Sequence, residues 1–376
     1  MKIGIDGRLY RSGVAGIGRY TQELVKNLLE IDKENSYILF LTPADMSECL
    51  LSAPNLEKVV APFPHYSLAE QTKFYRFLKR FDLDLMHFTN FNHPIRYRKP
   101  YVVTMHDLIM YFSRGRTKRG KFTRGICRYV IRDAARHAKK IIAVSKYSRE
   151  DVIKHLGADP EKVAAIYEGV AEQFIKVNTE EAEKVLQKFN IKKPFILYVG
   201  RWNEHKNVIG AIGALALLNK EMSNGGVRLV LGGKRDQAFP EIPKTIAKLG
   251  LTDKVIITDF LSDEELAALY QTAECFIFPS LYEGFGLPPL EAMRYGLPVV
   301  SSNRTSLPEV LGEAAVYVDP LNVSEMADAL FKVLTNKKFA ESLARLGLRQ
   351  VEKYSFRKMA EETLAIYRDA INGNNK

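Results

Sequence analysis

Cysteine is scarce in this sequence: Cys49, Cys127 and Cys275 are the only three in 376 residues, and they lie far apart. An odd and scattered set of this kind excludes a disulfide framework and lacks the paired spacing of a zinc site. Long apolar runs are missing as well, since none approaches the ~20 residues that a membrane-spanning helix needs. The first residues, MKIGIDGRLY, contain no apolar signal-peptide core. These absences predict a cytoplasmic protein.

Two common nucleotide-binding loops are also missing. Gly13, Gly16 and Gly18 in GVAGIGRY stand at the expected start of a helix, but without the Gly-x-Gly-x-x-Gly spacing of nicotinamide enzymes. The sequence has no P-loop with its Gly-Lys-Ser/Thr ending either. We still expect the glycine-rich turn around Gly16 to let the backbone approach a ligand closely.

Potential metal ligands are few. His87 and His93 in HFTNFNH have no carboxylate partner at a useful spacing. Asp82 and Asp84 form an Asp-x-Asp pair, but they precede a buried strand and lie far from the other polar motifs. We therefore predict a structural role for the two aspartates and no metal cofactor.

Positive charge is concentrated in one segment. The whole chain has a net charge of +11, and residues 94–149 contain 16 Lys and Arg against 2 Asp, which is a local charge of +14. The remainder of the chain is therefore slightly acidic, so the excess needs a local explanation. One interpretation is an ordinary amphipathic helix with a solvated charged face. The other is a helix with Phe122, Ile126, Tyr129, Val130 and Ala134 packed on its own domain and with cations that face an anionic membrane.

Strand-like and helix-like segments alternate along the whole chain, which predicts an α/β protein with doubly wound parallel sheets. One series begins with KIGIDG and a second begins with FILYVGRW, and a polar stretch that ends at Pro194 lies between them. We predict an N-terminal domain over residues 1–180, a second domain over 181–355, and a final helix over 356–376 that packs back on the N-terminal domain. Ligands of such sheets bind beyond the carboxyl ends of the strands.

The stretch FPSLYEGFGLPPLEAMRYGLPVV has the pattern strand, glycine turn, helix. Its helix should begin at the prolines and end at Gly296, and its N-terminus should present free amides to an anion such as a diphosphate. Glu283 lies in the turn, and we place Glu291 in the first turn of the helix. Because a carboxylate repels phosphate, the two acids are better suited to hydroxyl groups, one set on the ribose and one on a transferred sugar. A glutamate in a first helical turn also occurs simply because it complements the helix dipole.

A second motif, GRWNEHKN, follows the first strand of the second domain and contributes Arg201 and Lys206. Two cations on a loop are usually only solvated. At a strand end, near the helix N-terminus described above, they predict a clamp on phosphate oxygens.

These motifs together resemble the retaining glycosyltransferases of family 4. The resemblance covers nearly the whole chain and rests on the two glutamates of EGFGLPPLE, on GRWNEHK, on the early glycine-rich loop and on MHD at a strand end. It implies the GT-B fold, with two Rossmann-like domains that face a central cleft. The nearest similarity is to bacterial mannosyltransferases that build surface polysaccharides, which implies a nucleoside-diphosphate sugar as donor, GDP-mannose in particular, and a saccharide or lipid-linked acceptor.

The resemblance also implies roles for single residues. In the second domain, which would hold the donor, Glu291 would bind the ribose and Glu283 the transferred sugar. In the first domain, which would hold the acceptor, His106 would lie near the reacting face of the sugar; a lone histidine at a strand end is otherwise a common structural residue. The groups that would contact the diphosphate or the sugar nearby are Gly16, Arg201, Lys206 and the backbone amides of Phe285, Gly286 and Leu287.

The expected mechanism uses these cations and the helix dipole, without a metal, to stabilise the charge on the departing diphosphate. Glu283 is the only carboxylate available for a double displacement, and the family assigns it to hydroxyl binding, so we favour substitution from the front face. Two alternatives remain: a sugar phosphorylase or epimerase on the same fold, and a basic nucleic-acid binder that is not an enzyme. The second is disfavoured because no nucleic-acid module is present and the phosphate motifs lie outside the basic segment. The basic segment leads us to expect a peripheral position on the inner face of the membrane.

Overall fold

A computed structural model describes residues 1–11, 16–112, 118–170, 175–222, 225–233 and 239–372, with the backbone alone for 118–123. The chain divides into two compact units, Met1–Gly169 with Ser355–Lys376, and Val170–Tyr354. The sequence suggests a domain boundary between residues 180 and 181. Both residues lie in helix α7 (Thr179–Lys188). The chain thus leaves the first unit once and returns to it near its end. None of the described helices combines the length and the apolar character needed to cross a membrane.

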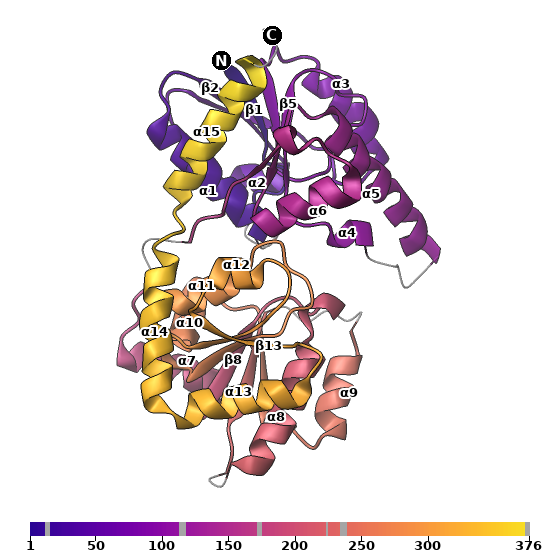
Figure 1. Cartoon of the computed structure of the whole chain (residues 1–376). Helices are drawn as coiled ribbons and strands as arrows, with labels where there is room; N and C mark the ends of the chain where they lie inside the picture. The colour runs from indigo at the N-terminus through magenta and orange to yellow at the C-terminus, as the bar shows by residue number, and fades with distance from the viewer. Residues whose placement is uncertain (12–15, 113–117, 171–174, 223–224, 234–238, 373–376) are drawn as a thin grey trace. The chain divides into compact units, whose positions relative to one another are not determined.

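The first unit contains a seven-stranded parallel sheet in the order β3-β2-β1-β4-β5-β6-β7. Figure 1 labels β1, β2 and β5 of this sheet. The order reverses between β1 and β4, which is the switch point where doubly wound sheets bind their ligands. Its strands are β1 (Lys2–Asp6), β2 (Ser36–Leu41), β3 (Leu56–Val60), β4 (Leu85–Phe88), β5 (Tyr101–Met105), β6 (Lys140–Ala143) and β7 (Val163–Ala165).

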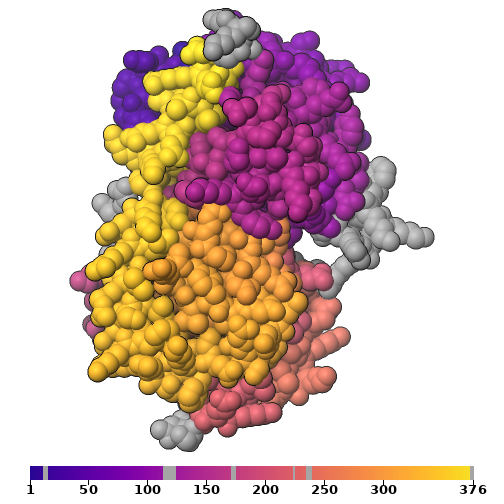
Figure 2. All heavy atoms as spheres, viewed as in Figure 1, coloured from indigo at the N-terminus to yellow at the C-terminus, as the bar shows by residue number. Residues whose placement is uncertain are grey.

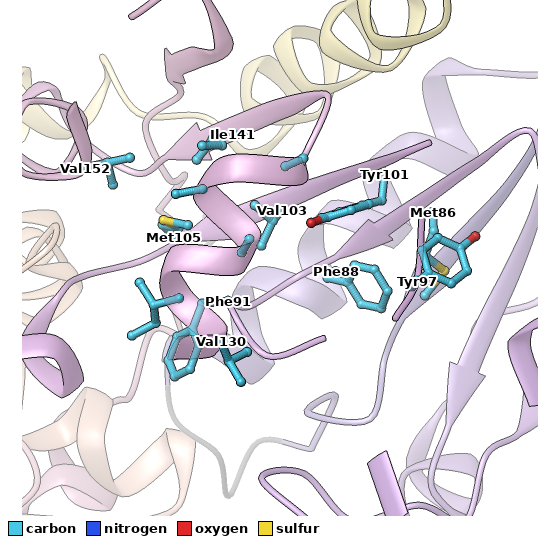
Figure 3. Packing of buried hydrophobic residues seen from close by; sticks show 14 of the residues in the cluster. Met86, Phe88, Phe91, Tyr97, Tyr101, Val103, Met105, Val130, Ile141 and Val152 are labelled. Carbon is cyan, nitrogen blue, oxygen red and sulfur yellow. The ribbon is translucent and has the colours of Figure 1, made fainter. Parts of the chain in front are cut away.

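Helices cover both faces of this sheet because its central strands are apolar on both sides. In β2, Tyr37 and Leu39 belong to one core cluster with α1 and α15, whereas Ile38 and Phe40 belong to a second cluster with α3, α5 and α6. Figure 3 shows part of the second cluster, in which Val130 of α5 is packed. The helical segments are α1 (Gly16–Ile31), α2 (Pro43–Glu48), η2 (Glu70–Phe74), α3 (Tyr75–Leu78), α4 (Ile109–Phe112), α5 (Lys118–His137), α6 (Lys146–Leu156), η3 (Pro160–Lys162) and α15 (Phe356–Asn372).

Helix α5 differs from its predicted orientation. Val130 and Ala134 are buried as expected, but Ile126 is 48% exposed and Tyr129 is 59% exposed. The prediction that these two residues cover the sheet was therefore wrong. Cys127 and Ile131 occupy the buried stripe beside Val130 and Ala134, and a helix of 3.6 residues per turn then places 126 and 129 outside that stripe. Phe122 lies among the residues whose side chains the structure does not describe.

The second unit contains a six-stranded parallel sheet in the order β10-β9-β8-β11-β12-β13, with its switch point between β8 and β11. The predicted fold of two doubly wound parallel sheets is confirmed. The strands are β8 (Phe195–Val199), β9 (Arg228–Gly232), β10 (Val255–Asp259), β11 (Cys275–Phe278), β12 (Val299–Ser302) and β13 (Ala315–Val318). The helical segments are α7 (Thr179–Lys188), η4 (Glu204–Lys206), α8 (Val208–Glu221), α9 (Glu241–Lys248), α10 (Asp263–Thr272), α11 (Leu287–Arg294), α12 (Leu307–Leu311), α13 (Val323–Thr335) and α14 (Lys337–Val351).

Helix α15 belongs to the first unit although it ends the chain. Figure 2 shows it in yellow on the surface of that unit, between indigo and magenta segments. It packs beside α1, and its Tyr367 is fully buried. The Tyr367 hydroxyl lies 2.7 Å from Nδ1 of the buried His87 on β4, and Nε2 of the same ring lies 2.8 Å from the Thr104 hydroxyl on β5. A polar chain within the core therefore fixes α15 to the sheet, which is the structural role of His87.

Candidate functional site

The loops that follow β8 and β11 meet at the switch point of the second unit. The Lys206 ammonium group donates a hydrogen bond of 2.6 Å to Oε1 of Glu283, and the Leu281 amide donates one of 2.6 Å to the His205 carbonyl. The side chains of Lys206 and Glu283 are 17% and 11% exposed, so the ion pair is mostly shielded from water but still reachable. The structure thus joins two of the predicted site residues directly.

A neighbouring loop holds Glu283 in place. The Glu283 amide donates to the Thr305 hydroxyl at 3.0 Å, and the Ser306 hydroxyl donates to the carbonyls of Glu283 (3.0 Å) and Phe285 (3.1 Å). The Lys206 ammonium also lies 5.4 Å from the centroid of the Phe278 ring, within the range of a cation–π contact. Both charged groups are therefore positioned before any ligand arrives.

The turn between Glu283 and helix α11 depends on glycine. Gly286 is the N-cap of α11 with φ +107°, and a Cβ atom there would lie 2.7 Å from Leu307 Cδ2. Phe285 is 4% exposed and its ring packs edge-on against Tyr354, so a ligand would meet the backbone of Phe285 rather than its ring. The helix then begins at Leu287 and ends before Gly296, which has φ +69°. The predicted turn is confirmed, but the helix ends one residue earlier than predicted, with Tyr295 as its C-cap and Gly296 in the left-handed conformation after it.

Glu291 lies one residue further along the helix than predicted, and therefore in its second turn. Because Gly286 is the N-cap and Leu287 the first helical residue, Glu291 is the fifth residue and falls in the second turn. The placement in the first turn was wrong, since the prolines occupy the second and third helical positions instead of opening the helix. The dipole effect is confined to the first turn, so it no longer accounts for this glutamate. The Tyr270 hydroxyl donates to Glu291 Oε2 at 3.3 Å.

Arg201 follows β8 after Gly200 and is exposed. It stands on the same loop as Lys206, and its carbonyl accepts a hydrogen bond of 3.0 Å from the Asn203 amide. The loop therefore carries two cations, of which Arg201 is exposed and Lys206 is mostly shielded.

In the first unit, His106 follows β5 and is 11% exposed. Its Nδ1 atom lies 3.0 Å from Glu168 Oε1, and its Nε2 atom lies 3.0 Å from the Thr89 carbonyl oxygen. A carboxylate and a carbonyl can only accept hydrogen bonds, so the ring meets both best when both of its nitrogens carry hydrogen. Burial by itself would lower the pKa of His106, but the hydrogen bond and the negative charge of Glu168 outweigh it and raise that pKa. This arrangement favours a positively charged imidazole over a general base.

Sequence reasoning missed Glu168. It is 4% exposed and lies just beyond β7, a strand of the same parallel sheet as β5. The carboxyl ends of parallel strands meet at one edge of a sheet, so an acid after the last strand could have been paired with His106 on this signal. Asp107, next to His106, accepts a hydrogen bond of 2.8 Å from the Ile109 amide.

A cluster of buried charged residues that form ion pairs lies at the switch point of the first unit. Arg8 follows β1 and donates to Asp6 (2.7 and 2.8 Å) and to Glu70 (2.8 Å), and its side chain is fully buried. Burial would raise the pKa of Asp6, but the charge and hydrogen bonds of Arg8 lower it. Gly7-Arg8 and Gly200-Arg201 thus occupy equivalent positions after the first strand of each sheet, but only the second arginine is exposed.

The glycine-rich loop is described in part. Gly13 lies outside the described residues. Gly16 begins α1 and is exposed, and a Cβ atom there would meet nothing within 4 Å, so its predicted approach to a diphosphate stays a prediction. Gly18 has a structural need for glycine, because a Cβ atom would lie 2.3 Å from the Arg11 carbonyl oxygen.

Across the described ranges, no group of three or more His, Cys, Asp or Glu side chains is placed to hold a metal ion. His93, one of the two histidines considered for this role, is instead paired with Asp133 at 3.0 Å.

Comparison with known proteins gives a match for each unit. The family model "Glycosyltransferase Family 4" matches residues 14–174, and "Glycosyl transferases group 1" matches residues 179–349. The O-antigen chain mannosyltransferase B of Escherichia coli is 28% identical over 373 residues, which cover 94% of this chain and 96% of that protein. The serotype-specific mannosyltransferase WbdA of Escherichia coli is 33% identical over 222 residues, which cover 58% of this chain but only 27% of that protein.

Solved structures show the same fold. The Anabaena protein HepE, solved in complex with UDP and glucose, superposes with a TM-score of 0.78 at 18% identity, and the match covers 98% of this chain and all of the HepE chain. At this identity the likeness concerns the fold alone.

Proposed function

This chain belongs to glycosyltransferase family 4 and has the GT-B fold, and from that premise we propose that it is a retaining mannosyltransferase. In this proposal it moves mannose from GDP-mannose to a saccharide or lipid-linked acceptor during synthesis of a surface polysaccharide. The observation that carries the proposal is the Lys206–Glu283 ion pair, which lies at the switch point of the second unit and beside the N-terminus of α11.

The ion pair suggests how the donor is held. A diphosphate is a stronger partner for an ammonium group than one carboxylate, so the donor would draw Lys206 onto its phosphate oxygens. Glu283 would then be free to accept hydrogen bonds from hydroxyls of the mannose. Arg201 on the same loop would supply a second cation, and the amides of Phe285, Gly286 and Leu287 would contact the sugar and phosphate.

Glu291 is proposed to bind the ribose. Its place in the second turn of α11 removes the helix dipole as an explanation, and the hydrogen bond from Tyr270 orients its carboxylate. The oxygens of a carboxylate accept hydrogen bonds, which is the chemistry that ribose hydroxyl groups require.

The proposed mechanism needs no metal. Arg201, Lys206 and the α11 N-terminus would stabilise the charge that develops on the departing diphosphate. Substitution would occur from the front face, with the leaving phosphate helping to take the proton of the acceptor. The roles of Gly16 and His106 in the reaction stay predictions.

The choice of mannose as the transferred sugar rests on the matched relatives. The matched Escherichia coli proteins are named mannosyltransferases, and one of them aligns over 96% of its length. A sugar phosphorylase on the same fold is the main alternative activity. Product analysis with and without orthophosphate separates the two, because a phosphorylase would form mannose 1-phosphate only when orthophosphate is present.

A peripheral position on an anionic membrane is part of the proposal. The exposed face of α5 combines Ile126 and Tyr129 with the exposed cations Arg128, Arg132 and Arg136. Apolar side chains among cations on one helical face suit the boundary of an anionic bilayer. This face would hold the enzyme beside a lipid-linked acceptor, and we expect no role for it in nucleic-acid binding.

Thermal unfolding in the presence of GDP-, UDP- and dTDP-sugars tests the choice of donor. A ligand at 100 times its Kd adds about 2.7 kcal/mol to the free energy of unfolding. We expect GDP-mannose to raise the melting temperature most. A larger rise with a UDP- or dTDP-sugar would contradict the proposed donor.

A further inference from the structure

We propose that Tyr66, together with Asn90 and Asn92, forms a pyranose-binding subsite at the carboxyl edge of the first unit's sheet. Tyr66 would be the surface on which a sugar ring stacks. The proposal deepens the proposed function, because it takes the acceptor to be a sugar and names the residues that would bind it.

The three residues converge from separate loops. Tyr66 lies on the loop after β3, and Asn90 and Asn92 lie on the loop after β4. Strand β4 is one side of the switch point of this sheet, where a doubly wound fold opens a crevice for its ligand.

The backbone of Tyr66 is held in an unfavourable conformation. Its φ angle is +53°, in the left-handed region that a bulky residue rarely adopts. Its amide donates a hydrogen bond of 3.1 Å to Glu70 Oε2, and Glu70 is itself held by the buried Arg8. Strain that the surroundings maintain in this way is found preferentially at ligand-binding positions.

The phenol ring is presented rather than packed away. Tyr66 is 49% exposed, whereas Asn90 and Asn92 beneath it are 5% and 2% exposed. The ring lies 5.7 Å, centroid to centroid, from the Phe91 ring, which supports it from the protein side. A half-exposed aromatic ring of this size can bind the apolar C–H face of a pyranose.

The hydrogen bonds around Tyr66 allow its hydroxyl group to act as a donor to a ligand. The Asn90 amide group donates to the Tyr66 hydroxyl at 2.9 Å and to Asn92 Oδ1 at 2.8 Å. The Asn92 amide group in turn donates to Glu70 Oε1 at 2.8 Å and faces His65 Nδ1 at 3.1 Å. Since the phenol oxygen accepts from Asn90, it keeps its own hydrogen for an acceptor such as a sugar hydroxyl.

Leu68, two residues away, is 83% exposed and provides a matched control. If this loop instead contacted a membrane, Leu68 would matter at least as much as Tyr66. If the loop binds a sugar, the aromatic ring matters and the leucine does not.

The test is saturation-transfer NMR on the full chain with methyl α-D-mannopyranoside, methyl α-D-glucopyranoside and methyl β-D-galactopyranoside. We expect the wild-type protein to bind at least one of them. Tyr66→Ala should weaken that binding by about tenfold, equivalent to the loss of about 1.4 kcal/mol. Tyr66→Phe should retain most of it, and Leu68→Ala should leave it unchanged. Tyr66→Leu, which keeps an apolar side chain but no aromatic face, serves if the alanine variant does not fold.

Calorimetry with GDP and GDP-mannose on the same proteins separates this proposal from the proposed function. Binding of a pyranoside with loss in Tyr66→Ala, but no binding of GDP-mannose, would support the subsite and contradict the donor assignment. The subsite is overturned if the wild-type protein binds none of the pyranosides. It is also overturned if Leu68→Ala loses as much affinity as Tyr66→Ala, or if Tyr66→Leu binds like the wild type.

Discussion

At the scale of single residues, Lys206 and Glu283 each neutralise the charge of the other. A mostly shielded pair of this kind is costly to break by removing one partner, because the remaining charge is left without compensation. In the proposed function, a donor molecule would separate the pair without that cost, since it would supply an anion for the lysine and hydroxyl groups for the glutamate.

Replacing this lysine tests its proposed role. We expect Lys206→Ala to lower kcat/KM for sugar transfer by about 100-fold or more, because a cation aimed at the departing diphosphate is lost. Lys220→Ala is the matched control, since Lys220 is an exposed lysine of the same unit in the last turn of α8. Steady-state kinetics measure kcat/KM for both variants. Near-normal turnover in Lys206→Ala would remove this residue from the mechanism.

The His106–Glu168 pair predicts a pH-dependent contribution to stability. The folded-state pKa of His106 is raised above its ordinary value of 6.5. The pair therefore stabilises the fold fully below pH 6.5, and this stabilisation is lost as the pH rises through the folded-state pKa. We expect Glu168→Gln to lower the free energy of unfolding by about 1–3 kcal/mol at acidic pH and by less at higher pH.

NMR titration of the His106 ring provides the direct measurement. The pKa of His106 should fall in Glu168→Gln, because burial remains while the opposing charge is gone. Glu161→Gln, at an exposed position of the same unit, should leave that pKa unchanged. An unaltered His106 pKa in Glu168→Gln would show that the carboxylate does not hold the imidazole in its charged form.

A comparison of Glu283 with Glu168 shows which single residues of a site can be predicted from sequence. Glu283 and Lys206 could be found because glycines, a strand end and a helix start surround each motif. Glu168 is harder to select, since its one signal is its place after the short strand β7, whose carboxyl end lies at the same edge of the sheet as that of β5. Its partner lies 62 residues away, and only the fold brings the two together.

At the scale of elements, α15 is held by its buried polar contacts as well as by apolar packing. Tyr367→Phe removes the hydroxyl that meets His87 Nδ1 and leaves that buried nitrogen without its partner. We expect the free energy of unfolding to fall by about 1–3 kcal/mol. Arg368→Ala, at the neighbouring position with a side chain 55% exposed, should change it by no more than about 0.5 kcal/mol. Denaturant titration compares the two, and equal effects would show that the polar chain contributes nothing.

The exposed face of α5 makes a prediction for vesicle binding. The protein should sediment with anionic vesicles at low salt and be released at high salt, because attraction between exposed charges is screened. Replacing Ile126 and Tyr129 together by serine should weaken sedimentation. The control is Leu346→Ser with Leu348→Ser on α14, where both leucines are also exposed. Equal recovery with neutral and anionic vesicles would leave α5 as a solvated face.

Charge neutralisation tests the same proposal independently of the apolar pair. Arg116 lies outside the described residues, and the side chains of Lys118, Arg119 and Lys121 are not described. Replacing these four cations by glutamine should still reduce sedimentation if the local charge of residues 94–149 attracts the membrane. Each cation near such a surface contributes about 1 kcal/mol.

The predictions for elements succeeded where apolar periodicity is strong. The alternation of strands and helices in both units follows from the apolar sequence patterns. Strand β3 has a weaker pattern, because it is an edge strand with no fully buried residue and two charged residues in LEKVV. The orientation of α5 was predicted wrongly because this helix contains more apolar residues than its buried stripe can accommodate. The apolar pattern therefore did not identify the face that packs against the sheet.

At the scale of the whole molecule, the two units repeat one topology and use it differently. In the first, the arginine after the opening strand is buried and holds Asp6 and Glu70. In the second, the equivalent Arg201 is exposed on the loop that also carries Lys206. Two cations on a loop at a switch point suit an anionic donor, whereas the polar but internally paired groups of the first unit suit a neutral sugar. This contrast is the physical basis for assigning the donor to the second unit.

The central claim is that the chain transfers mannose from GDP-mannose with retention and without a metal. The most direct test is NMR of the reaction between GDP-α-D-mannose and a mannose-terminated oligosaccharide, with and without excess EDTA. We predict release of GDP together with one new α-mannosyl anomeric signal, at rates that EDTA leaves largely unchanged. A β-mannosyl product, or activity that EDTA abolishes and a divalent ion restores, would contradict the account.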